Sequence, residues 1–163
     1  MTYYPLAVGN TWTYQNSDGS TFTNTVTAGE GSTFTMQNST QPQPQNIRFD
    51  GEVFLTDSYQ AGNWQVLLKE TIAPGDAWDI SYQANGIDTV LKMTVKAVGV
   101  SVEAGGRTYP DVAVIEGDMK MSMNGTPVPM TYLVQYHYAQ NVGLVLTTGS
   151  HGEAMGLVSF ELK

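Results

Sequence analysis

Six dipeptides made of Gly paired with Asp, Asn or another Gly divide this chain into short segments rich in β-branched and aromatic residues. They are Asp18-Gly19, Asp50-Gly51, Gly62-Asn63, Asn85-Gly86, Gly105-Gly106 and Asn124-Gly125. Such pairs supply the positive φ angles that tight hairpin turns need. Their recurrence predicts a meander of antiparallel strands.

Hydrophobic alternation supports this interpretation. Over residues 91–97, Leu, Met, Val and Ala alternate with Lys, Thr and Lys, which indicates a strand with one buried and one wet face. Similar patterns over 111–123 and 130–138 predict two long strands on either side of Asn124-Gly125. Further strands are expected at 20–27, 32–38, 47–50, 52–58, 64–70, 143–148 and 155–162. No stretch shows a convincing helical period of 3.6 residues.

These segments amount to roughly a dozen strands, more than a flat open sheet can hold without curling or splitting. At 163 residues the chain fits one domain with one core. We therefore predict a single all-β domain over residues 1–163. Its antiparallel meander should form a curved sheet, a half-barrel or a barrel, with very little helix.

Composition excludes several classes of function. The formal net charge of −8 opposes binding to phosphate backbones, so no nucleic-acid partner is expected. No apolar run is long enough to cross a bilayer, so no transmembrane segment is expected either. The chain has no cysteine, and only 13% of its residues are charged, a balance typical of exported β-proteins. We expect any signal sequence to have been removed from this chain.

No catalytic constellation is recognisable, and we predict no enzyme. His137 has the opposite parity to its aromatic neighbours, which places it toward solvent or a second layer, and His151 lies in a glycine-rich turn. Glu116 and Asp118 share one face of a strand, so a hydrolase with an acidic cleft is an alternative. Solvation of exposed strands explains the same pair.

The methionines offer two further interpretations. Met119, Met121 and Met123 alternate along one strand face, and thioethers suit Cu(I), so a copper-binding protein is a weaker alternative. Thioethers also fill irregular cores, and we expect neither a metal nor a cofactor. The second interpretation is a cavity for an apolar ligand, lined by six methionine and tyrosine residues. They are Met93, Met119, Met121, Met130, Tyr132 and Tyr136.

The opening of the chain predicts a closure of the core. Trp12 and Tyr14 share one face of a strand, and Leu6 and Val8 precede them. We expect these four side chains to plug one end of the core.

Three segments resemble a known group of proteins. They are YYPLAVGNTWTY at 3–14, VEAGGRTYPDVAVIEG at 102–117 and YHYAQNVGLVLTTGS at 136–150. Together they resemble a family of bacterial exported proteins and lipoproteins of unknown function, periplasmic and β-rich, related to the DUF3108-like group. The resemblance implies an antiparallel curved sheet or barrel, often anchored by a lipid on an N-terminal cysteine that this sequence lacks.

The composition and the family resemblance together lead to an expectation about function. We predict a non-enzymatic, exported bacterial envelope domain of unknown function, located in the periplasm, in the cell envelope or outside the cell. It would be a binding or structural module for a partner protein or a small apolar ligand. The resemblance also implies a lipid anchor in a full-length precursor.

Overall fold

The computed structural model describes residues 2–163, and within that range the regular structure consists of β-strands without a helix. The strands are β1 (Thr11–Asn16), β2 (Thr21–Glu30), β3 (Thr33–Asn38), β4 (Gln45–Phe49), β5 (Val53–Thr56), β6 (Gln65–Lys69), β7 (Ala77–Ala84), β8 (Ile87–Ala104), β9 (Arg107–Met123), β10 (Thr126–Pro127), β11 (Tyr132–Ala139), β12 (Gly143–Gly149) and β13 (Ala154–Glu161). The predicted all-β class is confirmed. That residues 1–163 form one domain stays a prediction.

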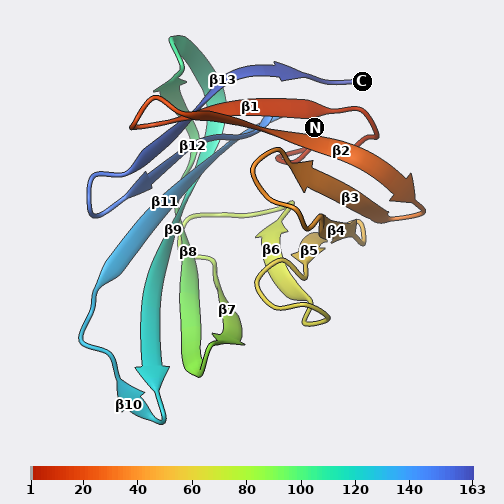
Figure 1. The fold of residues 1–163 in the computed structure, drawn as a ribbon. Coiled ribbons are helices and arrows are strands. Elements are labelled where there is room, and N and C mark those ends of the chain that lie inside the picture. The colour runs from red at the N-terminus through yellow and green to blue at the C-terminus, as the bar shows by residue number, and fades with distance from the viewer. Residues whose placement is uncertain (1) are drawn as a thin grey trace.

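All strands belong to one antiparallel sheet (Figure 1). Its order is β6-β5-β4-β3-β2-β1-β13-β12-β11-β9-β8-β7, and the short β10 pairs only with β9. The first and last long strands, β1 and β13, lie side by side in the middle of the sheet. From this pair the two halves of the chain curve away, and their outer strands β6 and β7 come together again as neighbours.

The contact between β6 and β7 is a seam without a backbone ladder, so the sheet is a nearly closed barrel. Side-chain amides bridge it instead. The amide of Ser81 donates to Oε1 of Gln65 at 3.2 Å, and the amide of Gln83 donates to Oε1 of Gln60 at 3.2 Å. Asn63 Nδ2 donates to the carbonyl of Ser81 at 3.3 Å.

The hairpin of β8 and β9 is longer than predicted, because both strands reach the Gly105-Gly106 turn. The predicted start at residue 111 is wrong, since Pro110 lies within β9 and does not end it. The ladder shifts its register between Val100 and Val102, and Asp111 has a φ of 55°. A bulge of this kind accommodates a proline that cannot donate to the ladder.

The inward faces of the strands form a continuous core. Trp12 and Tyr14 are 2% and 3% exposed, as expected for the plug. Trp12 Nε1 donates to the carbonyl of Val142 at 2.6 Å. The hydroxyl of Tyr14 donates to the carbonyl of Leu144 at 2.8 Å. Both aromatic side chains of β1 are therefore fixed to the opposite half of the chain.

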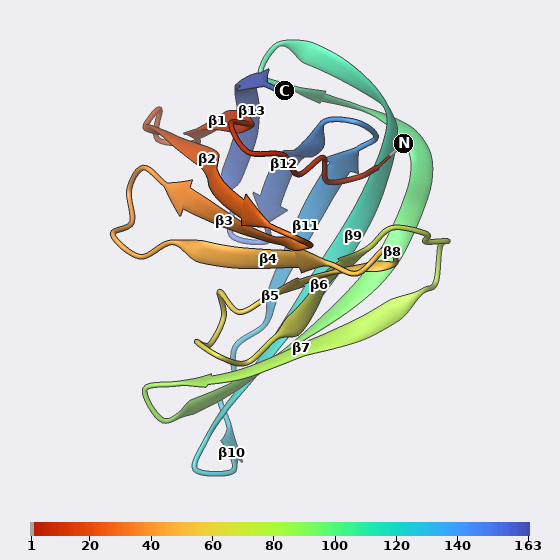
Figure 2. The same ribbon diagram turned by 90° about the vertical axis from the view of Figure 1, so that its right-hand side faces the viewer.

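Residues 2–10, the lead-in, cross the inside of the sheet's curve toward β1 (Figure 2). The amide of Asn141 donates to the carbonyl of Thr2 at 2.7 Å, and Tyr3 N donates to Oε1 of Glu70 at 2.9 Å. Near its other end, Asn10 Nδ2 donates to the carbonyl of Pro5 at 2.8 Å. Val8 is 52% exposed, so its predicted place in the plug is wrong. The aromatic side chains of the lead-in pack inward instead: Tyr3 is 7% exposed, and Tyr4 contacts Trp12 and Phe54.

Candidate functional site

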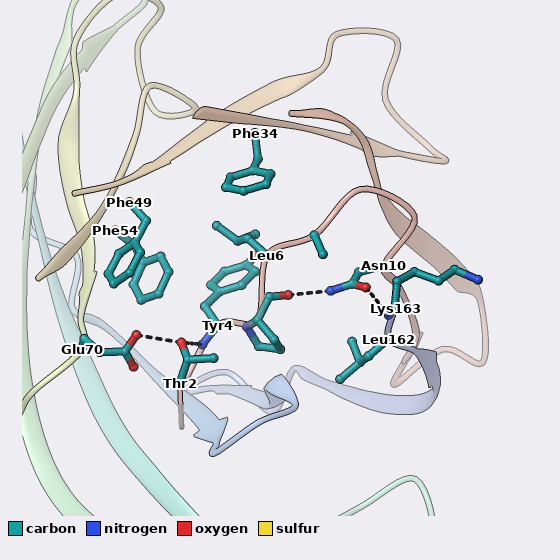
Figure 3. Close-up of a pocket in the computed structure, with 12 residues that line it drawn as sticks. Thr2, Tyr4, Leu6, Asn10, Phe34, Phe49, Phe54, Glu70, Leu162 and Lys163 are labelled. Atoms are coloured by element: carbon teal, nitrogen blue, oxygen red, sulfur yellow. Dashed lines mark hydrogen bonds between the residues drawn. The ribbon is translucent and has the colours of Figure 1, made fainter. Parts of the chain in front are cut away.

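A cleft of about 690 Å³ lies between the lead-in, strands β3 to β5 and the last residues of the chain (Figure 3). We call it the lead-in cleft. Its lining consists of Thr2, Tyr4, Pro5, Leu6, Ala7, Asn10, Phe34, Phe49, Phe54, Glu70, Leu162 and Lys163. Four aromatic rings therefore come from the lead-in and from three different strands to one apolar wall.

The aromatic wall is ordered by ring packing. Phe49 and Phe54 stack with their centroids 4.4 Å apart, and Tyr4 lies 5.7 Å from Phe54. Tyr4 also meets Trp12 edge-on at 5.8 Å. Because Tyr4 is held between these rings, it positions the lead-in over the core.

Polar groups occupy the two ends of the cleft. At one end Glu70 accepts hydrogen bonds from the Thr2 hydroxyl at 2.7 Å and from the Tyr3 amide. At the other end Asn10 accepts one from the Lys163 amide at 2.6 Å, while Lys163 Nζ lies 2.8 Å from a carboxylate oxygen of Glu161. Since these groups already have partners, the middle of the cleft presents mainly carbon.

A second cavity of about 390 Å³ lies on the other side of Tyr4, toward β11 and β12. We call it the tyrosine cavity. Its lining consists of Tyr4, Tyr14, Asn24, Met36, Gln41, Gln45, Ile47, Thr56, Ser58, Tyr59, Leu67, Tyr136, Tyr138 and Leu144. Five of these fourteen residues are tyrosines.

Burial keeps the tyrosine hydroxyls protonated. It raises the pKa of Tyr59 to about 12, with a smaller contribution from Tyr82. It also raises the pKa of Tyr136 and Tyr138 well above the ordinary value. At neutral pH these phenols therefore remain hydrogen-bond donors as well as acceptors.

The residues predicted to line an apolar cavity are distributed over several environments. Tyr136 belongs to the tyrosine cavity, and Met93 is 2% exposed in the core. Met119 and Met121 are half-buried on β9, and Met130 is 46% exposed. Tyr132, also half-buried, stacks on His151 with centroids 5.4 Å apart.

The lead-in cleft was missed because its aromatic residues are spread over the first half of the sequence. Phe34, Phe49 and Phe54 lie on three short strands whose order and curvature bring them together with Tyr4. The unusual lead-in, with Pro5 and Gly9 before the first strand, was the available signal. By itself this signal predicts a plug and not a cleft.

The residues of the alternative hydrolase site lie within the β9–β11 ladder, where Glu116 pairs with Gln135 and Asp118 with Leu133. Glu116 lines a small cavity of about 180 Å³ with Gln135 and Ser150, among others, while Asp118 is outside that lining. Asp118 instead lies 3.5 Å from Lys120 Nζ. The two carboxylates therefore do not converge on one cavity.

The structure also places the other residues considered for chemistry. His137 is buried at 8% exposure, so of its two predicted positions, toward solvent or toward a second layer, the first is wrong. Its Nδ1 lies 3.1 Å from the Leu146 carbonyl. Met123, the last member of the methionine run, is 48% exposed. Over residues 2–163, no group of three or more His, Cys, Asp or Glu side chains is arranged to hold a metal ion. A search of the same residues for helices that are long and apolar enough to span a membrane finds none.

Comparison with known proteins places the fold. No protein-family model matches the chain, and no curated protein matches its sequence. Among solved structures it is similar to a Bacteroides fragilis protein described as a "putative exported protein with YmcC-like fold". The two share 12% sequence identity with a TM-score of 0.62, over 98% of this chain and 99% of the other. At that identity the similarity shows a shared fold.

Proposed function

We propose that this chain is a non-enzymatic, exported bacterial envelope domain that binds a small apolar ligand in the lead-in cleft. The cleft itself carries the proposal. A concave cleft of about 690 Å³ lies beside four aromatic rings that come from the lead-in and three strands. Ligand sites are typically concave, mostly apolar and roughly 300–1,000 Å³ in volume.

Export is supported by different observations. The chain has a formal net charge of −8, no cysteine and few charged residues. The Bacteroides fragilis protein of similar fold is itself described as an exported protein. The resemblance to periplasmic proteins and lipoproteins of the DUF3108-like group belongs to the same proposal, as does a lipid anchor in the precursor.

The arrangement of polar groups favours an uncharged chain or ring as the bound part of the ligand. Glu70 already accepts a hydrogen bond from the Tyr3 amide, and Lys163 already forms an ion pair with Glu161. A ligand therefore gains by removing apolar surface from water, and its polar end can remain in solvent.

A fluorescent fatty-acid probe tests the proposal. We expect saturable binding at one probe per chain and a higher melting temperature in its presence. Phe34→Asn should weaken binding about tenfold or more, because it removes part of the aromatic wall from a half-buried position. Met121→Glu is the matched control, since Met121 lies on β9 outside the cleft lining.

Two outcomes would reject the cleft as the ligand site. The first is the absence of saturable binding by the folded wild-type protein. The remaining hypothesis would then be a module that binds a partner protein. The second is binding that Met121→Glu abolishes and Phe34→Asn preserves. That result would place the ligand on the methionine face of β9.

A further inference from the structure

The tyrosine cavity differs chemically from the lead-in cleft. Its fourteen lining residues include aromatic, aliphatic, amide and hydroxyl side chains but no charged one. A charged guest would lose its hydration there without gaining a counter-charge, which is costly. The cavity therefore selects against ions.

Several polar groups of this lining lack a protein partner. Within residues 2–163, the hydroxyls of Tyr59, Tyr136 and Tyr138 have no hydrogen bond to another protein group, in contrast to that of Tyr14. Tyr138 is only 4% exposed. The three hydroxyl oxygens are not among the buried side-chain atoms that lack a partner within the described residues, so they are open to water in the cavity. A ligand that displaces this water must replace its hydrogen bonds.

The other residues that line the tyrosine cavity contribute both hydrogen-bonding groups and apolar surface. Asn24 and Gln45 contribute side-chain amides, and Met36, Ile47 and Leu144 contribute apolar surface. A suitable guest is thus neutral, carries many hydrogen-bonding groups, and has apolar faces that can lie on aromatic rings. Sugar rings combine these three properties, because their C–H bonds form apolar faces and their hydroxyls both donate and accept.

We propose that the tyrosine cavity binds a neutral mono- or disaccharide. The volume of about 390 Å³ falls within the usual range for ligand sites. Tyr138 and Tyr136 hold the sugar through their hydroxyls, while Tyr4, which lines both cavities, is the wall between the sugar and the lead-in cleft. This site stands on its own lining and does not require an apolar ligand in the cleft.

Ligand-observed NMR and calorimetric titration of the full chain provide the test. The probes are glucose, galactose, mannose, N-acetylglucosamine, maltose and cellobiose, with glucuronate and glucosamine as charged comparators. We expect at least one neutral sugar to bind saturably at one per chain, and the charged sugars to bind at least tenfold more weakly.

Three variants locate the site. Tyr138→Phe removes one hydroxyl that has no protein partner, so the fold should persist by circular dichroism while sugar affinity falls about tenfold. Tyr136→Phe tests the same role at a half-buried position. It replaces Tyr138→Phe in the test if that variant does not fold. Tyr109→Phe is the control, since Tyr109 is 4% exposed but lies outside the cavity lining, against Phe160.

The proposal is overturned if none of the neutral sugars binds, or if glucuronate or glucosamine binds as tightly as they do. It is also overturned if binding is unaffected by Tyr138→Phe and Tyr136→Phe, or is weakened equally by Tyr109→Phe. Phe34→Asn and the fatty-acid probe report on the lead-in cleft alone, so failure of either site can be recognised separately.

Discussion

The amide of Ser81 on β7 donates a hydrogen bond to the side chain of Gln65 on β6, at 3.2 Å. In an ordinary barrel this amide would meet a backbone carbonyl of the neighbouring strand. Here a glutamine side chain takes that place, and Gln60 does the same for Gln83. The seam is therefore closed by groups that can rotate away without disturbing a ladder.

Removing these side chains should expose the seam selectively. In the double variant Gln60→Ala and Gln65→Ala, we expect the amides of Ser81 and Gln83 to exchange with deuterium at least tenfold faster. Amides of the β1–β13 ladder should be unchanged, as measured by NMR. Gln43→Ala, in the exposed β3–β4 loop, is the control. Equal acceleration throughout the sheet would show that the seam does not open separately.

Substitution by alanine should reduce stability to different extents at the adjacent glycines Gly105 and Gly106. Both have positive φ, +57° at Gly105 and +80° at Gly106, so alanine is strained at either position by roughly 1–2 kcal/mol. A Cβ at Gly105 would also collide with the carbonyl oxygen of Leu157, whereas a Cβ at Gly106 meets open space.

We therefore expect Gly105→Ala to lower the free energy of unfolding by about 1–3 kcal/mol more than Gly106→Ala. Urea denaturation measures the difference. Equal losses would mean that the β8–β9 turn does not rest on β13 in solution.

Trp12→Ala should reduce the free energy of unfolding by about 3–5 kcal/mol, because it empties a fully buried site beside Tyr4. Trp12→Phe retains part of the packing but leaves the Val142 carbonyl without its donor, so an intermediate loss is expected. Chemical denaturation checks both values. A loss below about 1 kcal/mol for Trp12→Ala, as at a surface site, would contradict this role.

His137 should make stability depend on pH. Burial lowers its pKa below the ordinary 6.5, and the Leu146 hydrogen bond offsets this only in part. The unfolded chain therefore takes up a proton in a range where the folded chain does not. Stability should be greatest above pH 6.5 and should decline as the pH falls through the folded pKa of His137.

Thermal unfolding at a series of pH values measures this dependence. His137→Gln should flatten the decline just below pH 6.5, and His151→Gln, in an exposed turn, should leave it in place. The buried tyrosines titrate far above this range. A wild-type melting temperature that rises as the pH falls below 6.5 would contradict the assignment.

Much of the fold could be predicted because turn chemistry and alternation agree. Gly105-Gly106 and Asn124-Gly125 separate strands in the structure as they do in the sequence. The order of strands could not be predicted, since nothing local indicates that Thr11 pairs with Glu161. Strand β9 begins at Arg107, before the predicted start at residue 111, because a bulge accommodates Pro110 within the strand.

The candidate sites were much less predictable. Alternation identifies which side chains share a face, as for Met119 and Met121, but not how faces from distant strands converge. The lead-in cleft depends on Tyr4 meeting Phe54 across the barrel, and the tyrosine cavity joins Tyr59 to Tyr138. Both depend on curvature, which is a property of the whole sheet.

The pairing of β1 with β13 also has a consequence for how the chain reaches its native state. Strands β1 to β6 and β7 to β13 are each largely series of neighbouring hairpins, which can form through local contacts. Joining them requires the closure of a loop that includes almost the entire chain, and such contacts slow folding. A slip of one residue in this ladder would turn Trp12 and Tyr14 outward. The search for the β1–β13 register should therefore limit the folding rate.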